Sequence, residues 1–454
     1  MVLKNLLYIL QSEGYYFKRF LSFAYAHPAW WKLEKRQKIV WTPKACLLWV
    51  MTAVIFWSIA IFSFSIFNRQ GLLMIPFLAI SLPFLMGISL MLIYPIDYIL
   101  KKKKIDTAEK IISSSNIKVV GIAGSYGKTS TKEILASILS QKLAVIKTPE
   151  NINTDIGIAN FIIENKKQFK ENDVFIVEMG AYRKGEIKKI CRMVRPFYSI
   201  LTGVNESHLE RFGSLDNIIQ GKFELPQNTR DLALLNLDDK NIRKNHTRFS
   251  LQKSLGISKQ ETQNIYPKEN FQGLEFRWQG KKFETILLAE HNISLILLCA
   301  KIAQKLSLSL DEICAGIKNI HPIEHRLQPI YNKHTDIMVI DDSYNGNFDG
   351  IKSGVQLLGR AVGRKVVLTP GLVELGSKTE SIHRQIGKLY SQHVDLVLII
   401  RSVMTDHIIQ GLKENNFTNY KIYETTQEAH ADLGNILQKS DTILFQNDLT
   451  DNYF

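Results

Sequence analysis

Residues 118–141 combine three patterns that together constrain how this chain folds. KVVGIA at 118–123 is a β-branched run typical of a buried strand, and 128–141 has the apolar spacing of an amphipathic helix. The turn between them, GSYGKTS at 124–130, contains two glycines. Such a turn lets backbone N–H groups and a helix N-terminus surround phosphate oxygens, while a lysine neutralises charge and a hydroxyl binds Mg²⁺. The segment therefore predicts a nucleotide phosphate loop in which Lys128 and Thr129 fill the last two roles.

The chain beyond residue 105 repeats this alternation of short apolar strands with amphipathic helices. Further expected strands lie at 173–179, 197–204, 336–341, 365–370, 395–400 and 441–445. A more polar, strand-like stretch at 274–288 and a helix at 292–306 separate two sets of such units. This alternation is typical of parallel sheets covered on both faces. We predict an α/β fold: a P-loop-type parallel-sheet central ATPase domain and a smaller Rossmann-like C-terminal domain, joined near His321-Pro322.

Two long apolar runs precede the α/β part. Residues 45–67 contain no charged side chain, and residues 71–100 contain only Asp97. Each exceeds the ~20 residues needed to cross a bilayer. Lysines flank the pair at Lys32, Lys35, Lys38, Lys44 and 101–104. The positive-inside rule then predicts a transmembrane hairpin with helices at about 45–67 and 72–100 that contacts membrane lipids. Both termini and the catalytic domains would lie on the cytoplasmic side of the cytoplasmic membrane. The alternative is a pair of buried core helices.

The charge distribution argues against nucleic acid as a partner. Of the formal net charge of +14, residues 1–104 carry +10 and the remaining 350 residues only +4. The basic excess therefore belongs to the apolar N-terminal segment. The four cysteines are scattered without a C-x-x-C pair, which excludes a disulfide framework. We predict three parts: an N-terminal segment at 1–110, a central ATP-binding domain at 111–323 and a C-terminal domain at 324–454.

The phosphate loop departs from the standard G-x-x-x-x-G-K-[ST] pattern, because Ile122 stands where that pattern has glycine. AGSYGKTSTKE instead resembles the loop of the Mur ligases, ATP-dependent amide-bond-forming enzymes of peptidoglycan synthesis. Further elements resemble that family in order: TPENINTDIG (148–157), VEMGAYRKGEI (177–187), NESHLERFGS (205–214), GKFEL (221–225), HN (291–292), HRL (325–327), DDSYNGN (341–347) and VELG (373–376) with His383. Within the family, DDSYN and ELG resemble the members that add D-alanyl-D-alanine.

The resemblance implies an enzyme that activates a substrate carboxylate with ATP as an acyl phosphate, which an amine then displaces. It implies catalytic residues Lys128, Glu178, His208 and Lys222. It implies two Mg²⁺ ions held by Thr129, Glu178, His208 and Lys222, the last as its carbamate. The ATP-binding residues would be Gly124, Ser125, Tyr126, Gly127, Lys128, Thr129, Ser130, Asn292, Arg326 and Asp342. The substrate-binding residues would be Asn151, Asn153, Tyr344 and Asn345.

Each side chain also has an ordinary structural interpretation. Glu178 alone would be a satisfied loop carboxylate, His208 a structural histidine and Lys222 a solvated helix lysine. DDSYNGN alone would be a polar turn that caps a helix. Only the ordered set of motifs favours the functional interpretation.

The implied partners are a peptidoglycan precursor and an amino acid or dipeptide, with D-Ala-D-Ala as the expected amine. Residues 1–110 differ from the UDP-binding domain with which family members ordinarily begin, so a lipid-linked precursor is an alternative substrate. Another amine, such as ammonia or a different amino acid, is a second alternative. A non-catalytic nucleotide-binding membrane scaffold and a nucleic-acid-linked P-loop ATPase are alternatives from other classes. The oligomeric state is not predicted.

Overall fold

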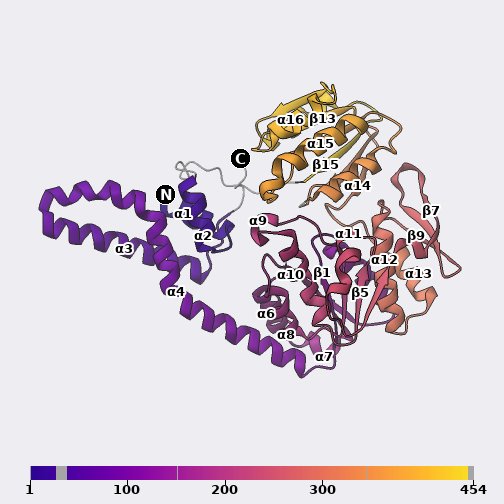
Figure 1. Cartoon of the computed structure of the whole chain (residues 1–454), viewed down its shortest axis with the longest axis horizontal. Coiled ribbons are helices and arrows are strands. Elements are labelled where there is room, and N and C mark those ends of the chain that lie inside the picture. The colour runs from indigo at the N-terminus through magenta and orange to yellow at the C-terminus, as the bar shows by residue number, and fades with distance from the viewer. Residues whose placement is uncertain (1, 27–37, 151, 345, 448–454) are drawn as a thin grey trace. The chain divides into compact units, whose positions relative to one another are not determined.

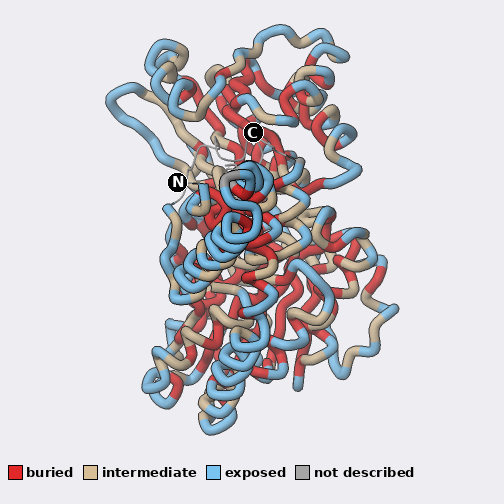
Figure 2. Tube along the Cα trace, turned by 90° about the vertical axis from the view of Figure 1, so that its left-hand side faces the viewer, coloured by how far each residue is buried: buried red, intermediate tan, exposed pale blue. Residues whose placement is uncertain are grey.

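The computed structural model describes residues 2–26, 38–150, 152–344 and 346–447. The chain divides into two compact units, Met1–Lys103 and Lys104–Leu449. Figure 2 colours the chain by burial, and among the described residues the second unit contains four buried apolar clusters, which lie against its two large sheets. Each unit therefore has a core of its own and is described separately.

The first unit is helical. Its elements are α1 (Val2–Ser12), α2 (Phe17–Ala26), α3 (Pro43–Phe67), the 3₁₀ helix η2 (Asn68–Leu73) and most of α4 (Met74–Ser113). Leu6, Leu7 and Phe20 of the two short helices are buried against Leu48 of α3 and Met86 of α4. The short helices therefore cover part of the apolar surface of the long ones.

The helix that contains the second apolar run is longer than the run itself. It is α4, which continues through the four lysines at 101–104 to Ser113. Lysine is a good helix former, so the charges mark the end of the apolar run but not the end of the helix. Pro83 and Pro95 lie inside α4. Beyond Lys104, Ala108 and Ile112 pack into the core of the second unit. Among the described residues, α3 and α4 are the two helices long and apolar enough to span a membrane by length and composition alone.

The middle part of the second unit is built on a six-stranded parallel sheet in the order β2-β3-β1-β4-β5-β6. The strands are β1 (Lys118–Ala123), β2 (Val145–Lys147), β3 (Val174–Met179), β4 (Tyr198–Leu201), β5 (Leu232–Asn236) and β6 (Ser254–Ile257). In β1 the side chains alternate between the faces: Val120 and Ile122 join one core cluster, and Val119 and Ala123 join the other. Both faces of this sheet are therefore buried, as the sequence predicts.

Helices cover both faces of the middle sheet. Figure 1 shows α8 and α10 on one side of β1 and β5, with α12 and α13 on the other. The helices are α5 (Lys128–Leu139), α6 (Asp155–Glu164), α7 (Gln168–Glu171), α8 (Glu186–Val194), α9 (Leu209–Phe212), α10 (Leu215–Gln227), α11 (Lys240–Asn245), α12 (His291–Lys305) and α13 (Leu310–Lys318), with 3₁₀ turns η3 (His246–Arg248), η4 (Lys259–Glu261) and η5 (Glu269–Phe271). The strand-like stretch at 274–288 belongs to a small antiparallel sheet of β7 (Gln263–Pro267), β8 (Leu274–Trp278) and β9 (Lys281–Thr285).

The C-terminal part is a second six-stranded sheet in the order β10-β11-β15-β12-β13-β14, antiparallel only between β10 and β11. The strands are β10 (Gln328–Asn332), β11 (Ile337–Asp342), β12 (Lys365–Thr369), β13 (Leu396–Ile400), β14 (Tyr420–Tyr423) and β15 (Thr442–Gln446). The helices are α14 (Phe348–Leu358), α15 (Thr379–His393), α16 (Thr405–Lys413) and α17 (Thr426–Ile436), with the 3₁₀ turn η6 (Gly376–Lys378). The predicted α/β class, with two parallel-sheet parts in this order, is confirmed.

The register of the middle sheet brings three strand ends together. Ala123, the last residue of β1, pairs with Met179 at the end of β3 and with Leu201 at the end of β4. The loops that follow these strands therefore leave the sheet at one edge, where ligands of open α/β sheets bind.

Candidate functional site

The phosphate loop lies between β1 and α5. Gly127 has φ of +75° and is the N-cap of α5, and an added Cβ at Gly124 would lie 2.1 Å from Thr202 Oγ1. Both glycines are therefore required by the path of the backbone. The Lys128 Nζ donates to the Gly124 carbonyl at 2.9 Å, so the ammonium folds back across the loop. The loop thus places a cation and a helix N-terminus together, which suits a phosphate group.

The side chain of Tyr126 anchors the phosphate loop to the middle part. Its hydroxyl donates to Asp239 Oδ2 at 2.7 Å, and a Cβ at Gly203 would lie 2.2 Å from its ring. Burial, together with the Asp239 carboxylate, raises the pKa of Tyr126. Of the predicted ATP-binding residues, Tyr126 can therefore offer a nucleotide its backbone, while its side chain anchors the loop to the middle sheet.

Glu178, near the end of β3, lies beside the phosphate loop. Its Oε2 accepts from Thr129 Oγ1 at 3.0 Å and its Oε1 from Asn153 Nδ2 at 3.3 Å. The Lys132 Nζ lies 3.5 Å from Oε2. Burial alone would raise the pKa of Glu178, but the charges of Lys128 and Lys132 hold it below its usual range. A hydroxyl and an ionised carboxylate thus stand side by side, which is an oxygen pair suited to Mg²⁺.

Lys222 of α10 is buried, with 2% of its surface exposed. Its Nζ donates to the Ala181 carbonyl at 3.1 Å. Burial, reinforced by the charge of Lys128, lowers the pKa of the Lys222 amine to about 7. The ordinary interpretation as a solvated helix lysine is therefore wrong, because this amine is enclosed and readily loses its proton.

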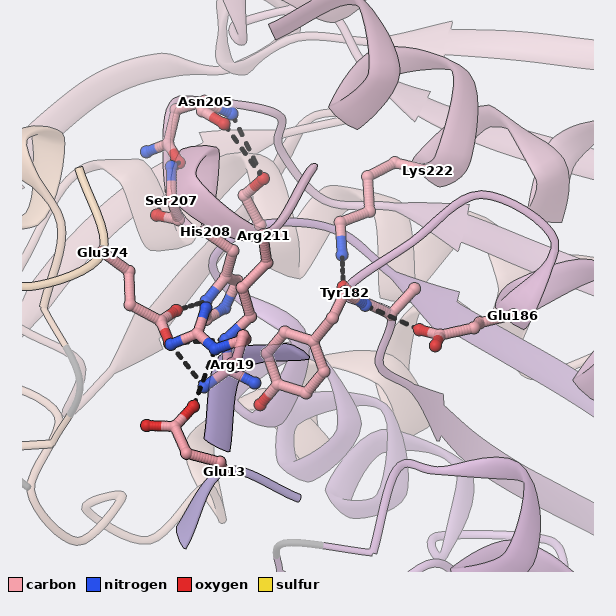
Figure 3. Close-up of polar contacts among 12 residues, drawn as sticks. Glu13, Arg19, Tyr182, Glu186, Asn205, Ser207, His208, Arg211, Lys222 and Glu374 are labelled. Atoms are coloured by element: carbon pink, nitrogen blue, oxygen red, sulfur yellow. Dashed lines mark hydrogen bonds and ion pairs between the residues drawn. The ribbon is translucent and has the colours of Figure 1, made fainter. Parts of the chain in front are cut away.

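His208 of the middle part contacts the C-terminal part. Its Nδ1 shares a hydrogen with Glu374 Oε2, and Arg211 Nε donates to the other oxygen of the same carboxylate at 2.5 Å (Figure 3). Burial lowers the pKa of His208, although Glu374 opposes this effect. Burial also disfavours the Glu374 anion, but His208 and Arg211 outweigh it and lower the pKa of Glu374 to about 2.

The predicted residues of the C-terminal part gather at the start of β10 and the end of β11. The Arg326 guanidinium lies 4.0 Å above the Tyr344 ring. Burial raises the pKa of Asp342 to about 7, opposed by the Arg326 charge. Burial lowers the pKa of Arg326, and the carboxylates of Asp342 and of Glu178 in the middle part oppose this effect.

Asn292 is buried in the first turn of α12, and Ser125 donates to the Asn205 carbonyl at 3.4 Å. Asn205 also reaches the C-terminal part, since its Nδ2 donates to Asn347 at 3.0 Å and to Asp349 at 3.1 Å. Asn151 and Asn345, two predicted substrate-binding residues, lie outside the described residues.

Three residues of this site were not predicted. Lys132 lies one helical turn after Lys128, where a charged residue on an otherwise buried helix face was the available signal. Glu374 stood within the VELG element and Arg211 within the NESHLERFGS element, both without an assigned role. Within the described ranges, no three His, Cys, Asp or Glu side chains gather as a metal site. A cation here would need oxygens from Thr129 and from a modified Lys222 in addition to Glu178.

Comparison with known proteins decides the family. The Mur ligase middle domain matches residues 122–303, and the Mur ligase glutamate ligase domain matches residues 325–446. The chain belongs to the Mur ligase family. The family predicted from the ordered motifs is therefore confirmed.

Named relatives of this Mur ligase are D-alanyl-D-alanine ligases. It is 30% identical over 283 residues to the UDP-N-acetylmuramoyl-tripeptide–D-alanyl-D-alanine ligase of Escherichia coli strain K12, a match that covers 60% of this chain and 61% of the relative. The enzyme of the same name from Buchnera aphidicola (subspecies Baizongia pistaciae) is 29% identical over 323 residues, with 69% of each chain covered. The match thus spans somewhat less than two thirds of the length of the first relative.

Solved structures share the fold. The MurF ligase of Thermotoga maritima in complex with ADP has a TM-score of 0.66 and 22% identity, and the match covers 77% of this chain and 80% of that one. MurF of Acinetobacter baumannii has a TM-score of 0.67 and 24% identity, with 77% of each chain covered. The fold predicted for this Mur ligase is that of the solved MurF enzymes.

The predicted location in the cytoplasmic membrane is wrong. The homologues are soluble cytoplasmic enzymes, and a pair of long apolar helices is weak evidence for a membrane span because core helices pass the same test. In α4, half of the most apolar window is buried. Within the first unit, Leu7 and Phe20 of the short helices share a buried cluster with Leu82 and Met86 of α4, so this part of the α4 surface belongs to a protein core.

Proposed function

We propose that this Mur ligase is an ATP-dependent amide-bond ligase of peptidoglycan precursor synthesis that joins D-Ala-D-Ala to a UDP-N-acetylmuramoyl tripeptide. The observation that carries the proposal is the meeting, at one sheet edge, of the phosphate loop and the Thr129–Glu178 pair. The names of the relatives supply the substrate pair. The predicted boundaries at 110 and 323 form part of the same proposal.

The residues of the site fit the first chemical step. A carboxylate oxygen of the tripeptide attacks the γ-phosphorus of ATP, and ADP leaves with the electrons of the broken P–O bond. Two anions must approach each other, so the step needs fixed cations at the point where charge accumulates. Lys128, which spans the phosphate loop, and Arg326, which faces it from the C-terminal part, supply this charge.

The second step forms the amide bond. The amine of D-Ala-D-Ala attacks the carbonyl carbon of the acyl phosphate, inorganic phosphate leaves, and the amine loses a proton. An acyl phosphate hydrolyses when water reaches it, so the cleft must close during the reaction. The contacts of Asn205 with Asn347 and Asp349 are of the kind that hold the two parts together in such a state.

The proposed ATP-binding residues are those predicted from the sequence, with Tyr126 acting through its backbone. Asn153 is a substrate-cleft residue that also supports Glu178. The stacking of the Arg326 guanidinium on the Tyr344 ring supports a role for Tyr344 in binding the substrate near that positive charge. Because Asn151 and Asn345 are not described, their assignment to the substrate rests on the motif alone.

Mg²⁺ fits the donors at the phosphate loop. Thr129 and Glu178 would hold one ion, which neutralises phosphate charge when it is bound. A second ion near His208 requires oxygens that the Lys222 amine does not provide. Addition of CO₂ to the neutral amine makes a carbamate with two oxygens. The burial of Lys222, which lowers the pKa of its amine, favours that modification.

Substrate-dependent ADP release tests the proposed function. We expect ADP and a UDP-linked pentapeptide to form in equal amounts when ATP, the tripeptide and D-Ala-D-Ala are all present. Omission of either the tripeptide or D-Ala-D-Ala should abolish the peptide product. Substitution of single amino acids or ammonia for D-Ala-D-Ala tests the alternative amines. ADP release without peptide product in every mixture would contradict the proposal.

Lys222→Ala tests the carbamate. We expect this variant to bind ATP but to lose ligase activity, and short carboxylates added to the buffer to restore part of that activity. Full activity of Lys222→Ala without added carboxylate would contradict the assignment.

A further inference from the structure

Glu374 occupies an unusual position in the loop that follows β12. Its backbone has φ of +61°, a conformation that residues with a side chain rarely adopt. Only 9% of the residue is exposed, so its carboxylate is held away from water. A strained backbone and a buried charge both cost stability, and they persist where the surrounding structure requires them.

Two partners of the Glu374 carboxylate come from the middle part of the unit, at α9 and its N-cap. One carboxylate oxygen contacts His208 Nδ1 and the other accepts from Arg211 Nε (Figure 3). His208 has φ of +63°, so both members of the contact have strained backbones. The Arg211 guanidinium also lies 4.2 Å above the Tyr182 ring, which fixes it from the opposite side.

Neighbouring contacts bring the same loop onto α9. Glu210 N donates to the Glu374 carbonyl at 3.2 Å, and the Lys378 Nζ lies 2.9 Å from Glu206 Oε1. The backbone and side chains of the 374–378 loop therefore contact residues 206–211 at several points, and the buried Glu374 carboxylate is one of them.

The C-terminal part holds this loop rigidly. His383 of α15 is fully buried; its Nε2 accepts from Leu372 N at 2.9 Å and its Nδ1 donates to the Thr379 carbonyl at 2.6 Å. Asn447 donates to the Gly371 carbonyl at 2.5 Å. Glu374 thus projects from a loop fixed at both ends, and its position follows that of the whole C-terminal part.

We propose that Glu374 is a positioning residue that couples closure of the two parts to the orientation of His208. The Glu374 carboxylate hydrogen-bonds to Nδ1 of the His208 imidazole, so Nε2 is the nitrogen that can bind another ligand. Histidines that bind metals nearly always hold their other nitrogen on a carboxylate or carbonyl in this way. Here that carboxylate comes from the C-terminal part, so the His208 site would be complete only when the two parts are in contact. Both the closure and the role toward a cation rest on the proposed function, whereas the contact itself is seen in the geometry.

Two measurements on the full chain test this inference without turnover. Spin labels at Lys170→Cys and Lys413→Cys, with Cys46 and Cys314 replaced by serine, report the distance between the two parts when the ATP analogue AMP-PNP and Mg²⁺ are present. The EPR signal of free Mn²⁺ reports cation affinity in the presence of AMP-PNP. The variant is Glu374→Gln, which keeps the shape and removes the charge.

The matched control is Glu380→Gln, a largely exposed carboxylate six residues later. We expect Glu374→Gln to broaden the distance distribution toward open states and to weaken Mn²⁺ binding 10- to 100-fold. We expect Glu380→Gln to behave as the unsubstituted chain. Should Glu374→Gln fail to fold, Glu374→Asp provides the same two measurements.

A closed distance and a Mn²⁺ affinity equal to those of the unsubstituted chain would overturn the proposal. Because neither measurement needs ligase activity, they remain decisive if the proposed reaction proves to be wrong.

Discussion

Two loops at the carboxyl ends of parallel strands contribute to the proposed site, and they are held in different ways. The loop after β1 is shaped by its own glycines and presents the Lys128 ammonium. The loop after β12 also contains a glycine with positive φ, Gly371, is held by the side chains of His383 and Asn447, and presents the Glu374 carboxylate. The glycines of the first loop form part of a recognisable motif, whereas the side chains that hold the second loop lie outside that loop.

The largest effect is expected at the cation of the first loop. Lys128→Met removes the charge that faces the phosphates, and we expect kcat/KM for ATP to fall about 10²–10³-fold. Nucleotide binding and turnover are measured by calorimetry and by ADP release. The control is Lys118→Met, because Lys118 is an exposed lysine at the start of β1, the strand before the loop. This variant should leave nucleotide binding and turnover unchanged. Full activity of Lys128→Met would contradict the assignment of this loop to phosphate binding.

If His383 holds the second loop in place, the free energy of unfolding should depend on pH through the protonation of His383. Burial lowers the pKa of His383 to about 4, while in the unfolded chain its pKa is about 6.5. Between these values the unfolded state binds the extra proton, so stability falls as the pH is lowered. The difference corresponds to about 3 kcal/mol, present in full above pH 6.5 and lost by about pH 4.

Urea unfolding across this pH range provides the measurement. We expect His383→Gln to be less stable at pH 7 and to show a smaller loss on acidification than the unsubstituted chain. The exposed His393→Gln, on the same helix, should keep the original slope. Identical slopes for the chain and for His383→Gln would contradict a neutral, buried His383 as the support of the loop.

A pair of glycine substitutions compares the loops directly, with a smaller expected effect. A Cβ at Gly124 would lie 2.1 Å from Thr202 Oγ1, and one at Gly371, where φ is +90°, would lie 2.9 Å from His383 Nε2. We expect Gly124→Ala and Gly371→Ala each to lose about 1–3 kcal/mol of unfolding free energy. Only Gly124→Ala should also weaken AMP-PNP binding in calorimetry.

Gly434→Ala in α17 is the control, because a Cβ there meets nothing within 4 Å. We expect no loss of stability from it, since alanine favours a helix over glycine. Equal weakening of AMP-PNP binding by Gly124→Ala and Gly371→Ala would mean that the two loops do not act separately.

The comparison also explains how much could be predicted from the sequence. The phosphate loop and the strands β1, β3, β4, β11, β12, β13 and β15 follow from local patterns, whereas β2, β5, β6, β7, β10 and β14 were not predicted. The role of Glu178 beside Thr129 came from the family motifs, and the rule that parallel strands end at one edge agrees with it. The contact between Glu374 and His208 could not be predicted in this way, because it joins residues 166 positions apart across two sheets. Its strained backbone leaves no mark in residue type.

The N-terminal segment shows the opposite limit. Apolar runs at 45–67 and 71–100 correctly predicted two long helices, but length and apolarity do not distinguish a bilayer from a protein core. Leu82 and Met86 share a buried cluster with residues of α1 and α2. The pattern of apolar residues within the two runs could not indicate this packing. The helices could therefore be predicted, and the environment of their surfaces could not.

The fate of the substrate oxygens tests the central claim most directly. With both oxygens of the tripeptide carboxylate labelled with ¹⁸O, an acyl phosphate intermediate transfers one label to phosphate when the amine displaces it. Mass spectrometry of the released phosphate should find one ¹⁸O atom for each peptide product formed. Amide product accompanied by unlabelled phosphate would contradict activation of the carboxylate by ATP at this site.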